Sequence, residues 1–264
     1  MRVWVGTSGF HYRHWRGRFY PVGLPTDRWL AWYVERYATV ELNAPFYRLP
    51  PASTFAHWAA IAPDGFRYAV KMSRYLTHVL RLRDPRGPVE LLLERCAPLG
   101  EHLGPLLLQL PPDLEAAPDR LAATLSAIPP GIQVAVEPRH ASWWSDEVQA
   151  VLRAHGEALC WADRRGPVTP DWATTDWRYL RYHEGTGEPR PCYGADAFTR
   201  WLRRLAADAP ATTDAWVYFN NDPNGCAIVD ADRSVREAGE LGLDVVRPGG
   251  APAATRPPSP PAPV

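Results

Sequence analysis

The stretch Phe66-Arg67-Tyr68-Ala69-Val70-Lys71-Met72-Ser73 contains a short and almost continuously apolar run. Runs of this length are typical of strands whose two faces are both buried, as in parallel sheets. Similar runs recur along the whole chain, so that eight strands are predicted. They are Val3–Thr7, Thr39–Asn43, Arg67–Lys71, Pro105–Leu110, Gln133–Glu137, Ala158–Ala162, Tyr179–His183 and Ala215–Asn220.

Helical patterns separate these strands, so strand and helix alternate along the chain. Ser53 is expected to cap the second of the helices. The segment Asp163–Asp176 holds Pro167 and Pro170 and shows no helical period, so the sixth helix is expected to be missing or reduced to one turn. The predicted helices are Asp27–Tyr37, Thr54–Ile61, Pro88–His102, Pro118–Ala127, Ser145–His155, Ala195–Ala207 and Arg233–Leu241.

Eight strands that alternate with helices in about 250 residues are typical of a (β/α)₈ barrel. The predicted fold class is therefore α/β, with a single TIM-type barrel over residues 1–247 whose sixth helix is missing or reduced. A doubly wound open sheet is the alternative, but Gly6-Thr7-Ser8-Gly9-Phe10 does not match the glycine-rich loop usual after its first strand. Residues 248–264 contain seven prolines and are predicted to form a disordered tail.

The bulk composition limits the classes of partner. The formal net charge is zero at pH 7, which argues against a strongly electrostatic nucleic-acid or membrane partner. No apolar run approaches ~20 residues, so no membrane span is predicted. Cys96, Cys160, Cys192 and Cys226 are far apart and form no CxxC pair, so free thiols in a reducing cytoplasm are expected. The composition does not indicate an oligomeric state.

Lys71 is the single lysine among 29 Lys and Arg residues. A lysine ammonium can lose its proton when desolvated and can then act as a base or nucleophile, whereas an arginine cannot. The alternatives are chance and a lysine that pairs with a buried carboxylate. We expect Lys71 to point into the barrel mouth, within hydrogen-bond or ion-pair reach of Glu41 or Glu137.

Polar side chains stand at or just beyond the ends of seven of the eight predicted strands. The carboxyl ends of barrel strands meet at one face, where barrel enzymes have their active sites, so we expect these side chains to converge. The expected catalytic residues are Lys71, Glu137, Glu41 and His183. The expected substrate-binding residues are Arg139, Arg181, Asn220, Asn43, Gln109, Tyr12, Trp15, His78 and Asp222.

Several roles stay open for these groups. Glu41 and Glu137 could be a glycosidase pair or a base with its orienting partner, or each could be the counter-ion of a nearby cation. Arg139 and Arg181 could clamp a carboxylate or phosphate, or could only neutralise the glutamates. His183 could be a general acid, a general base or a metal ligand. No metal-ligand spacing such as HxH or HExxH is present, so no metal site is assigned.

A set of short motifs, in order from residue 1 to about 245, resembles domain of unknown function 72, the YecE-like family. The motifs are Gly6-Thr7-Ser8-Gly9, Trp15 with Gly17, Phe19-Tyr20-Pro21, Thr39-Val40-Glu41-Leu42-Asn43, Phe46-Tyr47, Val70-Lys71, Thr77-His78, Leu108-Gln109-Leu110-Pro111, Val136-Glu137, Arg139-His140, Ser142-Trp143 and Tyr218-Phe219-Asn220-Asn221-Asp222. The resemblance implies a TIM-type barrel in a cytoplasmic protein, and it implies no particular reaction. The chain departs from the family pattern at Pro138, at Ala44-Pro45 and at Glu184.

Together these features predict an enzyme of the hydrolase or lyase type that acts on a small anionic or sugar-like substrate. In this hypothesis Lys71 and Glu137 transfer protons and Arg139 and Arg181 hold the anion, while other polar groups such as Asn220 and Gln109 orient hydroxyls. No cofactor is assigned, and a divalent metal stays open.

Two alternatives differ from this hypothesis. One is a metal-dependent barrel similar to sugar isomerases or apurinic endonucleases, which rests on analogy of fold alone. The other is a protein that binds nucleic acid or a metabolite without turnover. For nucleic acid, aromatic side chains beside arginines would stack on single-stranded bases, although the neutral net charge counts against it. These side chains are Tyr12, Trp15, Tyr20 and Tyr47, beside Arg16, Arg18 and Arg48.

Overall fold

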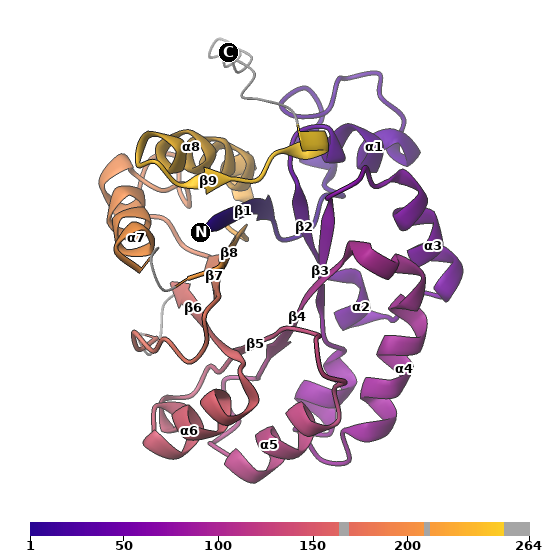
Figure 1. The fold of residues 1–264 in the computed structure, drawn as a ribbon. Coiled ribbons are helices and arrows are strands. Elements are labelled where there is room, and N and C mark those ends of the chain that lie inside the picture. The colour runs from indigo at the N-terminus through magenta and orange to yellow at the C-terminus, as the bar shows by residue number, and fades with distance from the viewer. Residues whose placement is uncertain (164–168, 209–211, 251–264) are drawn as a thin grey trace.

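The computed structural model describes residues 1–163, 169–208 and 212–250. Its centre is a nine-stranded sheet with the strand order β2-β3-β4-β5-β6-β7-β8-β1-β9. All the paired strands run parallel. The sheet curls into a half-barrel whose outer side is covered by helices (Figure 1). The α/β class predicted from the alternation of strands and helices is confirmed.

The eight predicted strands are all present, and each end lies within two residues of its predicted place. The strands are β1 (Arg2–Thr7), β2 (Thr39–Leu42), β3 (Arg67–Lys71), β4 (Leu103–Gln109), β5 (Val134–Glu137), β6 (Ala158–Asp163), β7 (Arg178–Tyr182), β8 (Asp214–Phe219) and β9 (Asp244–Val245). The ninth strand, β9, was not predicted. It has two residues, which is too short for a periodic signal, and it pairs with the start of β1.

The helices agree less closely with the prediction. They are α1 (Trp29–Val34), α2 (Ala44–Tyr47), α3 (Ala52–Ile61), α4 (Arg86–Cys96), α5 (Pro118–Ser126), α6 (Asp146–His155), α7 (Ala195–Asp208) and α8 (Cys226–Glu240). α8 begins seven residues before the predicted Arg233. α3 begins after Pro51 without a side-chain cap, so the predicted cap at Ser53 is wrong. The short helix α2 and a five-residue π-helix at Tyr75–Val79 were not predicted.

Two segments bear on the predicted boundaries. Residues 169–177, before β7, contain no helix, and residues 164–168 of the predicted helix-free segment lie outside the described part. The predicted tail starts with a single 3₁₀ turn at Pro248–Gly250, and its residues 251–264 also lie outside the described part. No helix in the described ranges is long and apolar enough to cross a membrane.

Buried side chains fall into two groups because successive residues of a strand point to opposite faces. The larger group packs between the sheet and the helices. The smaller group fills the inside of the curl with several alanines and with Trp4 and Trp216, whose rings stack 4.6 Å apart. In four strands, the inward-facing residue two positions closer to the carboxyl end is polar. Lys71 follows Ala69, Gln109 follows Leu107, Glu137 follows Ala135 and Arg181 follows Tyr179.

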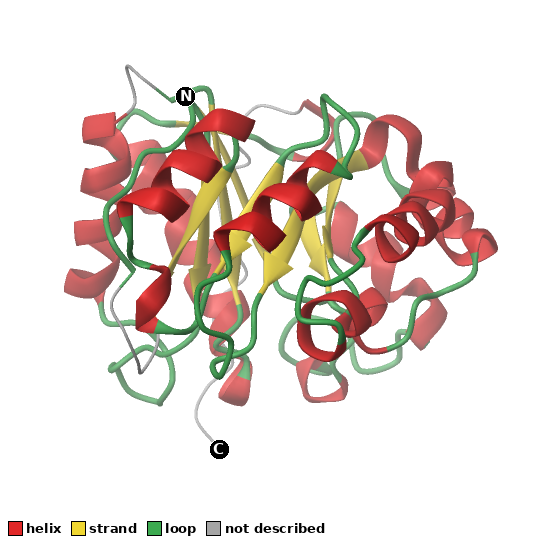
Figure 2. Cartoon of the chain, turned by 90° about the horizontal axis from the view of Figure 1, so that it is seen from below, coloured by secondary structure: helices red, strands yellow, loops and turns green. Residues whose placement is uncertain are grey.

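The two flanking strands β1 and β2 approach each other across the curl. Ser8 and Glu41 form one parallel bridge, and the Gly9 N–H donates to the Glu41 carbonyl at 2.8 Å. Figure 2 shows that the strand arrowheads lie at one end of the molecule, so the polar inner positions share that end. This arrangement brings residues from β2, β3, β4, β5 and β7 within reach of one another.

Gly6 allows the close approach of β1 to β2. A Cβ added at Gly6 would lie 2.2 Å from the Thr39 carbonyl oxygen, so alanine cannot fit without a backbone shift. We expect Gly6→Ala to lower the free energy of unfolding, measured in urea, by about 2–3 kcal/mol. The control is Gly87→Ala in α4, where an added Cβ meets nothing within 4 Å. This control should leave stability unchanged or raise it by up to ~1 kcal/mol. Equal stability of the two variants would contradict the close approach.

Candidate functional site

The Arg181 guanidinium on β7 joins two carboxylates inside the curl. Its Nη2 donates to Glu41 Oε1 at 2.8 Å and its Nη1 donates to Glu137 Oε2 at 2.6 Å. All three side chains are at most 1% exposed. Burial opposes the positive charge, but the two carboxylates outweigh it and hold the pKa of Arg181 well above its ordinary value. The arginine is therefore the shared counter-ion of both glutamates.

Both oxygens of Glu41 are bonded to donors. Its Oε1 bonds to Arg181, and its Oε2 accepts the hydroxyl of Tyr179 at 2.7 Å. A fully buried carboxylate with both oxygens bonded to donors is a poor general base, because its charge is already stabilised. The geometry favours the counter-ion interpretation of Glu41 over the glycosidase-pair interpretation.

Glu137 lies at the centre of the polar contacts. Gln109, its register neighbour on β4, donates to Oε2 at 2.9 Å. Oε1 lies 3.5 Å from Nε2 of His183 and 3.8 Å from Nε of Arg139. These contacts position Glu137 rather than free it, so the geometry gives it the same counter-ion role as Glu41.

His183 is held through contacts at both of its ring nitrogens. The Asn220 amide nitrogen lies 3.0 Å from Nδ1. Nε2 lies 3.4 Å from Nη1 of Arg181 and 3.5 Å from Oε1 of Glu137. Burial lowers the pKa of His183, and this favours the neutral ring. The backbone N–H of His183 donates to Asp163 Oδ1 at 2.8 Å. The amide nitrogen of Asn220 therefore helps to position His183.

Lys71 differs from the other charged groups of the site. Its ammonium lies 4.1 Å from the ring centroid of Phe46, and it makes no hydrogen bond or ion pair with any described residue. The predicted direct contact with Glu41 or Glu137 is therefore absent. Burial, reinforced by the charge of Arg181, lowers the pKa of Lys71 to about 8. The side chain is inward-facing, as predicted, and only slightly exposed.

An aromatic group covers the Lys71 side of the site. Phe46, on α2, packs edge-on against the ring of His78 with centroids 5.1 Å apart. His78 lies on the π-helix, and Thr77 Oγ1 lies 2.8 Å from its Nδ1. Burial and the charge of Lys71 lower the pKa of His78 to about 4, so this ring is neutral near pH 7. Phe46 entered the sequence analysis only as part of a motif, because ring contacts across loops leave no periodic signal.

Glu41, Lys71, Gln109, Glu137, Arg139, Arg181 and His183 are called the carboxyl-end cluster below. Tyr12 lies beside it, where its hydroxyl donates to the Ser8 carbonyl at 2.6 Å. Trp15 and Asp222 instead bond to each other, with Trp15 Nε1 2.6 Å from Asp222 Oδ1. Asn43 and Tyr12 line a neighbouring cavity of about 600 Å³ that also contains His11 and His57.

Two of the four aromatic side chains predicted to stack on nucleic-acid bases are buried. Trp15 and Tyr20 are at most 1% exposed, since both pack into the core beneath the β1 loop. Tyr47 is well exposed. The described residues contain no group of three or more His, Cys, Asp and Glu side chains that could hold a metal ion.

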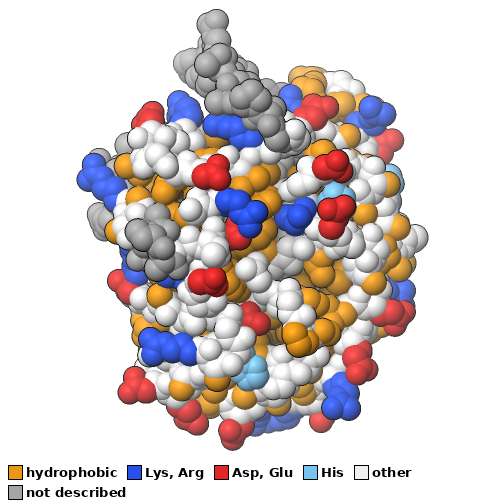
Figure 3. Space-filling view, viewed as in Figure 1, with side chains coloured by type: hydrophobic (Ala, Val, Ile, Leu, Met, Phe, Trp, Pro, Cys, Tyr) orange, Lys and Arg blue, Asp and Glu red, His pale blue; other side chains and the backbone are white. Residues whose placement is uncertain are grey.

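A cavity of about 810 Å³ lies at the opposite end, where the strands begin. Figure 3 shows this end, with apolar side chains in the middle and charged ones around them. Trp4 and Trp216 line it, and Asp214 accepts from Trp4 Nε1 and from Arg2, each at 2.8 Å. Trp4 and Trp216 belong to the inner group of buried side chains, so this cavity adjoins that group.

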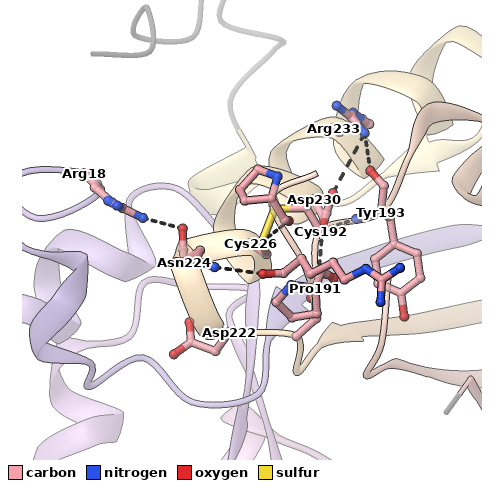
Figure 4. Close-up of a disulfide and its surroundings, with 12 residues drawn as sticks. Arg18, Pro191, Cys192, Tyr193, Asp222, Asn224, Cys226, Asp230 and Arg233 are labelled. Atoms are coloured by element: carbon pink, nitrogen blue, oxygen red, sulfur yellow. Dashed lines mark hydrogen bonds and ion pairs between the residues drawn. A yellow bond between two sulfur atoms is a disulfide. The ribbon is translucent and has the colours of Figure 1, made fainter. Parts of the chain in front are cut away.

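A disulfide joins Cys192 and Cys226, two residues that were expected to be free thiols (Figure 4). That prediction is wrong for this pair and holds for Cys96 and Cys160. The two half-cystines are 34 residues apart in the sequence. They meet because β7 and β8 are neighbours in the sheet, so the segments that follow their carboxyl ends lie together.

Comparison with known proteins shows that the chain matches one family model and is similar to several solved structures. The profile of the family described as "Protein of unknown function DUF72" matches residues 4–255. A DUF72 family protein from Thermotoga maritima is 29% identical with a TM-score of 0.79, over 89% of this chain and 98% of that one. One from Enterococcus faecalis is 18% identical with a TM-score of 0.72, over 92% and 98%. No curated protein matches the chain.

Removal of the shared counter-ion should strongly destabilise the fold. Arg181→Leu leaves two buried carboxylates without their cation, so we expect it to lower the free energy of unfolding by about 3–5 kcal/mol. The control is Arg190→Leu, because Arg190 is 68% exposed and lies 4.0 Å from Glu188. Its effect should stay within about 0.5 kcal/mol. Chemical denaturation checks both, and equal effects would contradict the counter-ion role.

Lys71→Met should stabilise the protein at neutral pH. Below pH 8 the wild-type lysine is charged in both the folded and unfolded states, and the folded state bears the cost of burying that charge. Above pH 10.5 it is neutral in both. The pKa difference corresponds to at most about 3 kcal/mol. We expect Lys71→Met to be 1–3 kcal/mol more stable at about pH 7, with the advantage shrinking as the pH rises from 8 to 10.5. A stability difference that does not change with pH would contradict the lowered pKa.

Proposed function

Because the chain belongs to the DUF72 family, whose description assigns no function, we propose a function from the chain's own residues. The protein is an enzyme of the lyase or hydrolase type, and its reactive group is the amine of Lys71. Its substrate is a small anion, and the reaction takes place at the carboxyl ends of the strands without a redox cofactor. The sheet is interpreted as a (β/α)₈ barrel whose closure runs between β1 and β2.

The barrel interpretation is supported by contacts between the flanking strands. β1 and β2 share the bridge between Ser8 and Glu41, and Tyr33 adds a second link between them. Its hydroxyl accepts the Thr7 N–H at 3.0 Å and donates to the Thr39 carbonyl at 3.2 Å. Active sites of barrel enzymes lie at the carboxyl ends of the strands, where the carboxyl-end cluster stands.

The observation that carries the proposal is the state of Lys71. An amine with a pKa of about 8 is roughly one tenth free base at pH 7, about 300-fold more than an ordinary lysine. A free-base amine can remove a proton or attack a carbonyl carbon. Lys71 makes no hydrogen bond or ion pair with a described residue, and its ammonium rests only against the ring of Phe46.

The charge balance of the carboxyl-end cluster supports an anionic substrate. Lys71, Arg139 and Arg181 are opposed by two carboxylates, and the pKa of His183 is lowered toward the neutral ring. Both terminal nitrogens of Arg181 already bond to the glutamates. The side chain of Arg139 is 27% exposed, and its Nε is as far as 3.8 Å from Oε1 of Glu137. Its guanidinium is therefore better placed than that of Arg181 to bind a carboxylate or phosphate.

Two buried polar atoms that lack a hydrogen-bond partner among the described residues support a substrate with hydroxyl groups. Ser8 Oγ and Asn43 Oδ1 are buried, and neither has a hydrogen-bond partner among the described residues. Ser8 bridges to Glu41, and Asn43 follows Glu41 by two residues. A buried polar atom without a partner is unfavourable by about 1–3 kcal/mol, which a substrate hydroxyl would relieve.

The single lysine makes the proposal directly measurable. Reductive methylation with ¹³C-formaldehyde labels only Lys71 and the α-amino group, since the chain has no other lysine. We expect the Lys71 methyl signal to titrate near pH 8. The Lys71→Arg variant lacks this signal and therefore assigns it. A midpoint near 10.5 would contradict the proposed function.

A second measurement tests nucleophilic attack and anion binding. If the amine attacks a keto acid, it forms an imine with release of water, and borohydride traps this imine as a stable adduct. We expect pyruvate and borohydride to modify the Lys71 peptide in the wild type, as detected by mass spectrometry. Arg139→Leu should slow this labelling about tenfold, the size of one charged hydrogen bond. Unchanged labelling in that variant would contradict the role of Arg139.

A further inference from the structure

The loop after β7 connects the disulfide to the carboxyl-end cluster. Tyr193 directly follows Cys192, and its hydroxyl donates to Asp163 Oδ2 while it accepts the backbone N–H of Glu184 at 3.0 Å. The other oxygen of Asp163 accepts the backbone N–H of His183 at 2.8 Å. An unbroken path of bonds therefore runs from Cys192 through Tyr193 and Asp163 to His183.

The opposite half of the disulfide is fixed in a helix. Cys226 is the first residue of the fifteen-residue helix α8 and is fully buried, whereas Cys192 lies in the loop and is slightly exposed. Around them, Asn221 donates to the Pro191 carbonyl at 3.0 Å and Asp230 accepts the Tyr193 N–H at 3.0 Å. Figure 4 shows Pro191, Tyr193 and Asp230 around the disulfide.

The surroundings indicate how the disulfide would be opened. The positive end of the α8 dipole stabilises a thiolate on Cys226, which makes this sulfur the better leaving group. Cys192 is the more exposed half and hence the point of attack. After reduction, two thiols need more room than a bonded pair. Cys226 is fixed in the first turn of α8, so the shift falls on Cys192 and on Tyr193 beside it.

We propose that the Cys192–Cys226 disulfide is a redox switch that sets the position of His183 in the carboxyl-end cluster. A thiolate of a dithiol reductant attacks Cys192 Sγ, the S–S bond breaks, and its electron pair leaves on Cys226. The second thiol of the reductant resolves the mixed disulfide, so two electrons and two protons reach the protein and the reductant leaves as a disulfide. The Tyr193 hydroxyl then moves away from Asp163 and releases His183. The effect on catalysis rests on the proposed function, whereas the effect on His183 does not.

The test follows the His183 ring by NMR in the full-length protein. The His183→Asn variant assigns its imidazole signals. We expect dithiothreitol to shift these signals by more than one linewidth, and removal of the reductant with air oxidation to restore them. Tyr193→Phe, which keeps the disulfide but breaks the path, should shift the same signals without reductant. Unchanged His183 signals on reduction, or a protein that keeps four free thiols under air, would overturn the proposal.

Cysteine variants provide matched controls. The double variant Cys192→Ser with Cys226→Ser should resemble the reduced wild type and should not respond to dithiothreitol. Cys96→Ser removes a buried cysteine of α4 that has no part in the disulfide, and it should respond as the wild type does. A double variant whose His183 signals match the oxidised wild type would overturn the switch. If His183 responds while Lys71 titrates near 10.5, the proposed function fails and the switch stands.

Discussion

The ion triad of Arg181, Glu41 and Glu137 constrains the inside of the sheet more than any other contact. Three charges buried beside an inner core made mainly of alanines and aromatic rings are tolerable only if each is paired and hydrogen-bonded. Because the partners come from β7, β2 and β5, the triad links strands that are not neighbours in the sheet. It therefore fixes the curvature as well as the charge.

This constraint explains why Lys71 differs from its neighbours. The two available carboxylates already share Arg181, so a further cation at the same level has no free counter-ion among the described residues and rests against Phe46 instead. A fixed positive charge in low dielectric then repels the ammonium and adds to the effect of its own burial. The lowered pKa of Lys71 is thus a consequence first of its burial and then of the nearby charge of Arg181, not of a hydrogen bond or ion pair.

Much of this arrangement is predictable from the order of residues. Apolar runs with a polar residue at the last inward position indicated both the strands and the inner placement of Lys71 and Gln109, because alternation along a strand is a local rule. The pairing of the charges is not local. Whether Glu41 meets Lys71 or Arg181 depends on distances across the curl, and both choices fit the same sequence.

The remaining differences have similar causes. A serine before a helical pattern favours a cap at Ser53, but α3 begins at Ala52, directly after Pro51, and has no side-chain cap. The Cys192–Cys226 pair depends on β7 and β8 being adjacent, which a spacing rule such as CxxC does not detect. α2 and the π-helix are each about one turn long, so they lack enough residues to show a period.

The carboxyl-end cluster is supported differently on its two sides. On the β2 and β5 side, its groups are held by strand residues whose backbones are paired in the sheet, such as Glu137 beside Gln109. On the β7 side, His183 lies just beyond the strand and depends on Asp163 and on the loop that carries Tyr193. Opening a few contacts in a loop costs less free energy than separating paired strands. A change at that loop can therefore move His183 while the ion triad and Lys71 keep their places.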